Sequence, residues 1–153
     1  MLGALLVLPS FLILLIGNPV LGSAERMPFA GADSLRLKKD VVHLSTLPAP
    51  RSFGHEAWLD SAAAYSSREL HAAGYSPRAQ VYEVGGKKYK NIIAYYGDPT
   101  KARKVVGAHY DVCEDQPGAD DNASGTAGLL ELARMLKKEG KILPFCVEMV
   151  FYT

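Results

Sequence analysis

Four residues with metal-binding side chains lie close together in the sequence: His109, Asp111, Asp120 and Asp121. The apolar run at residues 105–108 predicts a buried strand that ends at His109. Side chains two positions apart in an extended chain point to the same side, so His109 and Asp111 should face together. A metal-bound imidazole commonly donates its other ring N–H to a carboxylate. The spacing thus suits His109 as a metal ligand and Asp111 as the residue that orients it.

Asp120 and Asp121 come from the loop that follows, immediately before a predicted helix. A carboxylate there can hold one cation or bridge two, because each of its oxygens can bind separately. The same residue types also have ordinary structural roles, since aspartates before a helix are often caps and a histidine at a strand end often belongs to the packing. Spacing alone leaves open both a metal site and a purely structural loop.

Two strands and a helix are predicted around these residues. Residues 104–109 and 145–153 are apolar runs typical of buried strands, and residues 124–139 place apolar side chains at helical spacing, with Ser124 as the expected cap. Strand, helix and strand in this order form a βαβ unit with parallel strands. We therefore expect an α/β fold with a mixed, largely parallel sheet and helices on both faces, cut off after the second strand of this unit. Sites in such sheets form at the carboxyl ends of strands, where His109 lies.

The preceding residues predict two helices and a hairpin. Residues 35–47 and 55–73 have the charge and apolar spacing of helices. Residues 80–84 and 87–96 predict the two strands of a β-hairpin, because the pair of glycines between them can adopt the positive φ angles of a tight turn. No internal repeat or low-complexity segment is found. We expect one domain over residues 25–153.

The first residues predict export from the cell. Residues 2–21 contain no charged side chain, and the small residues at positions 22–24 are typical of a cleavage site. Pro9 interrupts the apolar run, which is shorter than the roughly 20 residues that a membrane-spanning helix needs. We therefore expect residues 1–24 to be a signal peptide, the mature protein to be secreted, and no stable membrane insertion. A retained membrane anchor is the weaker alternative.

The net charge of the chain limits its possible partners. The net charge is +1 and there is no basic cluster, which argues against nucleic acid as a partner.

Cys113 follows the end of one predicted strand, and Cys146 lies near the start of its parallel neighbour. At about 3.3 Å per residue, the two Cα atoms would lie well beyond the roughly 7 Å limit of a disulfide. Two free thiols are therefore predicted.

Two segments of the sequence indicate a particular protein family. The sequences VVGAHYDV at residues 105–112 and PGADDNASGTAGLLELARML at residues 117–136 resemble the secreted zinc aminopeptidase family, which also includes the transferrin receptor and glutamate carboxypeptidase. The sequence KNIIA at residues 90–94 is also similar to the family's approach to this strand. The resemblance therefore runs from about residue 35 to the end, and it implies the zinc exopeptidase-like fold.

The resemblance also implies roles for single residues. His109 would bind one zinc ion, Asp111 would orient His109, and Asp121 would bridge the two zinc ions of the complete enzyme. Asp120 would shape the loop, with direct ligation as the minor alternative. The implied reaction is hydrolysis of the amino-terminal residue from a peptide with a free amino terminus, with zinc polarising the carbonyl and activating water. Asn122 begins a glycosylation sequon that we expect to be unused inside such a loop.

The family's general base has no counterpart in this sequence. In the family, a pair of glutamates follows the strand that resembles residues 147–153, one as general base and one as ligand, and a further Asp and His complete the two zinc shells. Glu148 lies inside the predicted strand, and Glu114 or Asp115 would require the loop to fold back. Catalytic zinc usually has three protein ligands and a water. We therefore expect an incomplete catalytic domain that binds metal weakly and is inactive alone.

Two other functions remain open. Glutaminyl cyclases resemble the same family and act with one zinc ion on amino-terminal glutamine, although residues 119–122 look more like the two-zinc members. A secreted, non-catalytic remnant of the peptidase scaffold is the second alternative. The retention of His109, Asp111 and Asp121 argues against such decay.

Overall fold

The computed structural model describes residues 31–153, and the expected signal peptide at residues 1–24 lies outside the described residues. The helices and strands follow the predicted order, with boundaries that differ by at most a few residues. Within residues 31–153, no helix is long and apolar enough to cross a membrane. In chain order the elements are α2 (Ser34–Ser45), α3 (Glu56–Ala72), β1 (Arg78–Val84), β2 (Lys87–Tyr96), β3 (Arg103–His109), the irregular turn η1 (Ala119–Ala123), α4 (Ser124–Glu139) and β4 (Cys146–Tyr152).

The ends of these elements follow from local chemistry. Asp33 begins α2, because its Oδ1 accepts hydrogen bonds from the backbone N–H groups of Leu35 and Arg36 at 3.0 and 3.1 Å. Gly140 ends α4 in the left-handed conformation, with φ of 61°. The two residues of the hairpin turn, Gly85 and Gly86, have φ of 59° and 80°, as the sequence predicts.

The four described strands form one mixed sheet in the order β1-β2-β4-β3. The predicted parallel pairing of β3 with β4 is confirmed, with His109 beside Tyr152. The other two pairs, β1 with β2 and β2 with β4, are antiparallel. Within the described residues the sheet is therefore mixed without being largely parallel, because β4 is inserted between the hairpin and β3.

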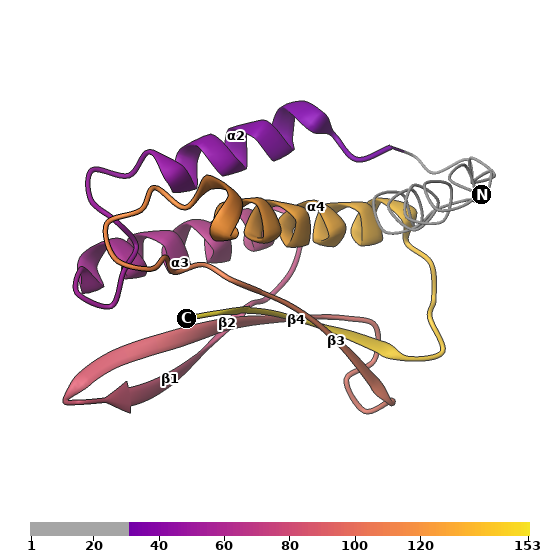
Figure 1. Ribbon diagram of the computed structural model, residues 1–153. Coiled ribbons are helices and arrows are strands. Elements are labelled where there is room, and N and C mark those ends of the chain that lie inside the picture. The colour runs from indigo at the N-terminus through magenta and orange to yellow at the C-terminus, as the bar shows by residue number, and fades with distance from the viewer. Residues whose placement is uncertain (1–30) are drawn as a thin grey trace, which may run out of the picture. The chain divides into compact units, whose positions relative to one another are not determined.

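One face of the sheet carries all three described helices, α2, α3 and α4 (Figure 1). The expected helices on both faces are therefore not found within residues 31–153. Met149 and Phe151 of β4 are fully buried in a core cluster that also contains Leu44 of α2, Leu70 of α3 and Leu130 of α4. On the helix-free face, Val105 of β3 is 64% exposed.

Both cysteines are free, as predicted. Cys113 is exposed beyond the end of β3, and Cys146 is buried at the first position of β4. In the parallel pair, Cys146 lies beside Arg103, the first residue of β3. The two sulfur atoms are thus separated by the length of a strand.

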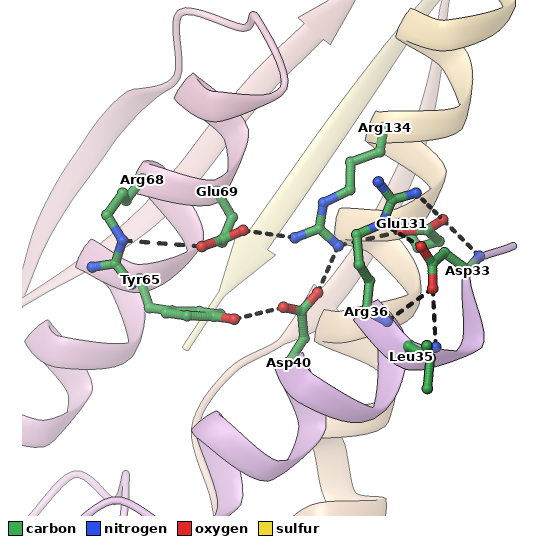
Figure 2. Close-up of polar contacts among 9 residues, drawn as sticks. All are labelled: Asp33, Leu35, Arg36, Asp40, Tyr65, Arg68, Glu69, Glu131 and Arg134. Atoms are coloured by element: carbon green, nitrogen blue, oxygen red, sulfur yellow. Dashed lines mark hydrogen bonds and ion pairs between the residues drawn. The ribbon is translucent and has the colours of Figure 1, made fainter.

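A network of ion pairs joins α2, α3 and α4 to one another (Figure 2). Arg134 of α4 donates to Asp40 of α2 at 2.6 Å and to Glu69 of α3 at 2.9 Å. Glu131, also on α4, lies 3.3 Å from Arg134 and accepts a hydrogen bond from the backbone N–H of Asp33 at 2.9 Å. Asp40 and Glu131 are both almost fully buried. The helices are therefore held together by charges as well as by apolar contacts.

Candidate metal centre

The structure brings three of the predicted site residues together at the carboxyl end of β3. His109 Nδ1 lies 3.0 Å from Asp111 Oδ1, and His109 Nε2 lies 3.1 Å from Asp121 Oδ1. When Nδ1 carries the ring proton, it donates to Asp111 and leaves the Nε2 lone pair directed at the Asp121 carboxylate. The imidazole is thus held between two carboxylates that come from different segments of the chain.

Hydrogen bonds to β2, β4 and α4 hold the end of β3 in place. The backbone N–H of Tyr110 donates to the carbonyl of Tyr152 on β4 at 2.8 Å. The carbonyl of His109 accepts a hydrogen bond from Thr126 Oγ1, in the first turn of α4, at 3.1 Å. The Tyr110 hydroxyl, whose pKa is raised by burial, donates to the carbonyl of Lys90 on β2. The His109 backbone is therefore anchored to β2, β4 and α4.

The loop before α4 turns sharply at Gly118, where φ is 60°. A Cβ atom at this position would lie 2.1 Å from Val112 Cγ1 and 2.6 Å from the Asp121 carbonyl oxygen, so only glycine fits. The backbone N–H of Ala123 donates to the Gly118 carbonyl at 2.9 Å and closes the turn η1. This turn carries Asp121 towards His109.

Asn122 takes the capping role that the sequence assigns to Ser124. Its Oδ1 accepts a hydrogen bond from the backbone N–H of Gly125 at 2.8 Å, whereas Ser124 Oγ donates to the Asp120 carbonyl at 2.8 Å. The side chain that would carry a glycan is therefore engaged inside the loop. The unused sequon itself stays a prediction.

The other acidic residues do not join this cluster. Within residues 31–153, the Asp120 carboxylate has no hydrogen bond or ion pair and is exposed. Glu148 is paired with Arg103 at 3.3 Å and accepts from the Tyr95 hydroxyl at 3.2 Å, in the interior of β4. Across the described part of the chain, no three His, Cys, Asp or Glu side chains converge in a geometry that could hold a metal ion.

The donor atoms that do converge fit a zinc ion in type and spacing. Imidazole nitrogen and carboxylate oxygen are both common zinc ligands, and two ligand atoms on one tetrahedral zinc lie about 3.4 Å apart. His109 Nε2 and Asp121 Oδ1 are 3.1 Å apart. The side chains of His109 and Asp121 are 31% and 77% exposed, so the site is open to solvent and to further ligands.

Arg51 is the residue near the site that the sequence does not reveal. It lies in the loop between α2 and α3, is only 2% exposed, and donates to the carbonyl oxygens of Tyr110, Pro117 and Gly118. No periodic pattern or motif marks a buried arginine in a loop. The prolines before it in the sequence, Pro48 and Pro50, predict only that the helix has ended.

Known proteins resemble this chain in sequence. Residues 91–153 match the model of Peptidase family M28. The uncharacterized protein YfbL of Escherichia coli is 40% identical over 112 residues, which cover 68% of this chain and 35% of that protein. Aminopeptidase YwaD of Bacillus subtilis is 42% identical over 74 residues, covering 42% of this chain and 14% of that protein. The chain thus spans about a third or less of the length of these relatives.

Solved structures resemble it in fold. Glutaminyl cyclase of Fimbriiglobus ruber matches with a TM-score of 0.70 at 22% identity, over 82% of this chain and 46% of that one. Glutaminyl cyclase of Porphyromonas gingivalis matches with a TM-score of 0.57 at 30% identity, over 80% of this chain and 45% of that one. A protein of Bacteroides vulgatus named for Zn-dependent exopeptidase activity matches with a TM-score of 0.59 at 22% identity, over 82% and 48%. Residues 91–153 are therefore similar to Peptidase family M28, and the described residues have the mixed α/β fold found in glutaminyl cyclases and zinc exopeptidases.

Proposed function

We propose that this chain carries part of the metal centre of a secreted zinc-dependent aminopeptidase. The observation that carries the proposal is the convergence of His109 Nε2 and Asp121 Oδ1, 3.1 Å apart, at the carboxyl end of a strand. The match to Peptidase family M28 and the likeness to an aminopeptidase of Bacillus subtilis support it. The substrate class is a peptide with a free amino terminus.

Three side chains have roles in this proposal. His109 would bind zinc through Nε2, while Asp111 accepts a hydrogen bond from Nδ1–H, which fixes the tautomer and makes the imidazole a better ligand. Asp121 would hold metal through its two carboxylate oxygens, each of which can bind a cation separately, as a residue shared by two zinc ions must. Bound zinc supplies the polarisation of the substrate carbonyl and the activation of water. Asp120 shapes the loop, in keeping with its exposed side chain.

The general base and the remaining ligands are not identified among residues 31–153. Two ligands are fewer than the three that a catalytic zinc usually has. We therefore propose that the chain by itself binds zinc weakly and does not turn over substrate. Hydrolysis of leucine p-nitroanilide by the purified chain, dependent on added zinc, would contradict this part of the proposal.

The test is a zinc titration of the purified chain in competition with a chromophoric chelator. We expect measurable binding that is lost in the His109→Ala and Asp121→Asn variants. His71→Ala is the matched control, because His71 is exposed at the end of α3, far along the chain from the site. Equal affinity in wild type and His109→Ala would show that the assigned site is not the one that binds metal.

Glutaminyl cyclase activity is the second candidate. The 30% identity to the cyclase of Porphyromonas gingivalis, with a TM-score of 0.57, favours it. Reading the encoding frame beyond Thr153 for paired glutamates, and for a later Asp and His, separates both enzymes from a non-catalytic remnant. Release of free amino acid from a peptide then favours the peptidase, and pyroglutamate from a glutaminyl peptide favours the cyclase.

A further inference from the structure

Arg51 is the largest fully buried side chain in the described residues, and all of its hydrogen bonds go to backbone carbonyl oxygens. Nε donates to the carbonyl of Tyr110 at 2.8 Å, and Nη2 donates to the carbonyl of Gly118 at 3.1 Å. Nη1 donates to the carbonyl of Pro117 at 3.1 Å and to that of Leu44. One guanidinium therefore joins three separate segments of the chain.

Two of these segments carry the candidate metal ligands. Tyr110 lies between His109 and Asp111, whereas Gly118 lies three residues before Asp121. The backbone carbonyl of Arg51 itself accepts a hydrogen bond from the N–H of Val112 at 2.9 Å. The strand end and the loop are thus fixed to the same residue, and through it to each other.

The charge of Arg51 is unusual for its position. Within residues 31–153, none of the ion pairs involves its guanidinium. Burial lowers the pKa of Arg51, and the negative charge of Asp111 acts in the opposite direction. A buried charge without an ion pair is costly unless hydrogen bonds compensate it. In this protein, backbone carbonyl oxygens from three segments of the chain compensate the charge of Arg51. The charge is therefore stabilised only while these segments keep their arrangement.

Arginine is the side chain that this arrangement requires. Its planar guanidinium carries five N–H donors in a rigid fork, so it can reach carbonyls in several directions at fixed spacing. The single ammonium group of lysine cannot span the Tyr110 and Gly118 carbonyls in the same way. The space is also tight, since a Cβ on Gly118 would lie 2.9 Å from Arg51 Nη2.

We propose that Arg51 is a positioning residue that sets the separation of His109 and Asp121 and so determines the zinc affinity of the site. The proposal rests on the proposed function where it concerns zinc. Its structural part, the clamp between the strand end and the loop, stands on the hydrogen bonds of Arg51 alone. A merely stabilising role would lower global stability without a specific effect on the loop or on metal binding.

The test compares Arg51→Lys with Arg134→Lys in the full chain. Arg134 is the matched control, because it is also a largely buried arginine with several partners, but its partners lie in the ion network between the helices. Both variants are expected to lose stability in urea unfolding. Zinc affinity is measured by chelator competition, and hydrogen exchange is measured at the amides of Val112 and Ala123, which close the clamp and the turn.

We expect Arg51→Lys to weaken zinc binding about 10- to 100-fold, the range seen when groups that orient metal ligands are removed. Exchange at Val112 and Ala123 should become faster in Arg51→Lys than in Arg134→Lys at matched global stability. Equal losses of affinity and equal exchange in the two variants would overturn the proposal. If the wild-type chain binds no zinc, the metal function fails, and exchange at the two amides alone decides whether the clamp exists.

Discussion

At the scale of single residues, Asp111 is the simplest test of the site. Its carboxylate lies 3.0 Å from His109 Nδ1 and is not expected to touch the metal. Asp111→Asn removes the charge that makes the imidazole a stronger ligand, while the side chain keeps its shape. We expect zinc affinity to fall about 10- to 100-fold with little change in stability. Chelator competition and urea unfolding measure the two effects.

Asp115→Asn is the control for this substitution, because Asp115 is exposed in the same loop and has no hydrogen bond within the described residues. It removes the same charge near the site without touching His109. If both variants lost affinity equally, the effect of Asp111 would be one of overall charge, and its orienting role would be wrong.

The sequence predicts the site residues unequally. His109 and Asp111 follow from the period of an extended strand, because two positions return the side chain to the same side. The approach of Asp121 depends on the turn at Gly118, whose geometry is set by contacts with Val112 and Arg51 that no local pattern encodes. Spacing named both Asp120 and Asp121, the family resemblance singled out Asp121, and only the structure shows Arg51.

At the scale of elements, the loop between β3 and α4 depends on one glycine. Gly118→Ala would place a methyl group 2.1 Å from Val112 Cγ1 in a left-handed backbone conformation. The conformation costs roughly 1–2 kcal/mol and overpacking about 1–3 kcal/mol. We expect a loss of about 2–5 kcal/mol in the free energy of unfolding, measured by urea denaturation.

Gly128→Ala is the matched control within the next element. Gly128 lies on an exposed position of α4, where an added Cβ would meet nothing within 4 Å. Alanine in a helix interior is favoured over glycine by about 0.5–1 kcal/mol, so this variant should be slightly more stable. Destabilisation of similar size in both variants would mean that the left-handed backbone and close contacts of Gly118 do not cause the loss of stability.

Single elements were predictable because each carries a local pattern. The glycines at positions 85, 86 and 140 mark a turn and a helix end, and each adopts the positive φ that its place requires. Pairing between distant strands has no such pattern. In the antiparallel pair of β2 and β4, Ile92 lies beside Phe151. Only the structure shows that this pairing forms in place of a largely parallel sheet.

At the scale of the whole molecule, the ion network should make stability depend on acid pH. Burial alone would raise the pKa of Glu131, but hydrogen bonds from the backbone of Asp33 and from Arg36 outweigh it and lower the pKa below its ordinary value of 4.5. A lowered folded-state pKa contributes stability above the unfolded value, and this stability is lost as pH falls through the folded value. Residues on α2 and α4 share this contribution (Figure 2).

Glu131→Gln tests this dependence, because glutamine keeps the size of the side chain and removes its charge. At pH 7 we expect a loss of about 1.5–3 kcal/mol, the usual value of a hydrogen bond to a charged group. The difference from wild type should begin to shrink as pH falls below the ordinary pKa of 4.5, and it should vanish only below the lower folded-state pKa, where wild-type Glu131 becomes neutral. Glu139→Gln, at an exposed pair with Lys141 on the surface, should cost at most about 1 kcal/mol. Unfolding curves at pH 7 and pH 3.5 that give the same difference between wild type and Glu131→Gln would show that Glu131 is not held as a charged group by the network.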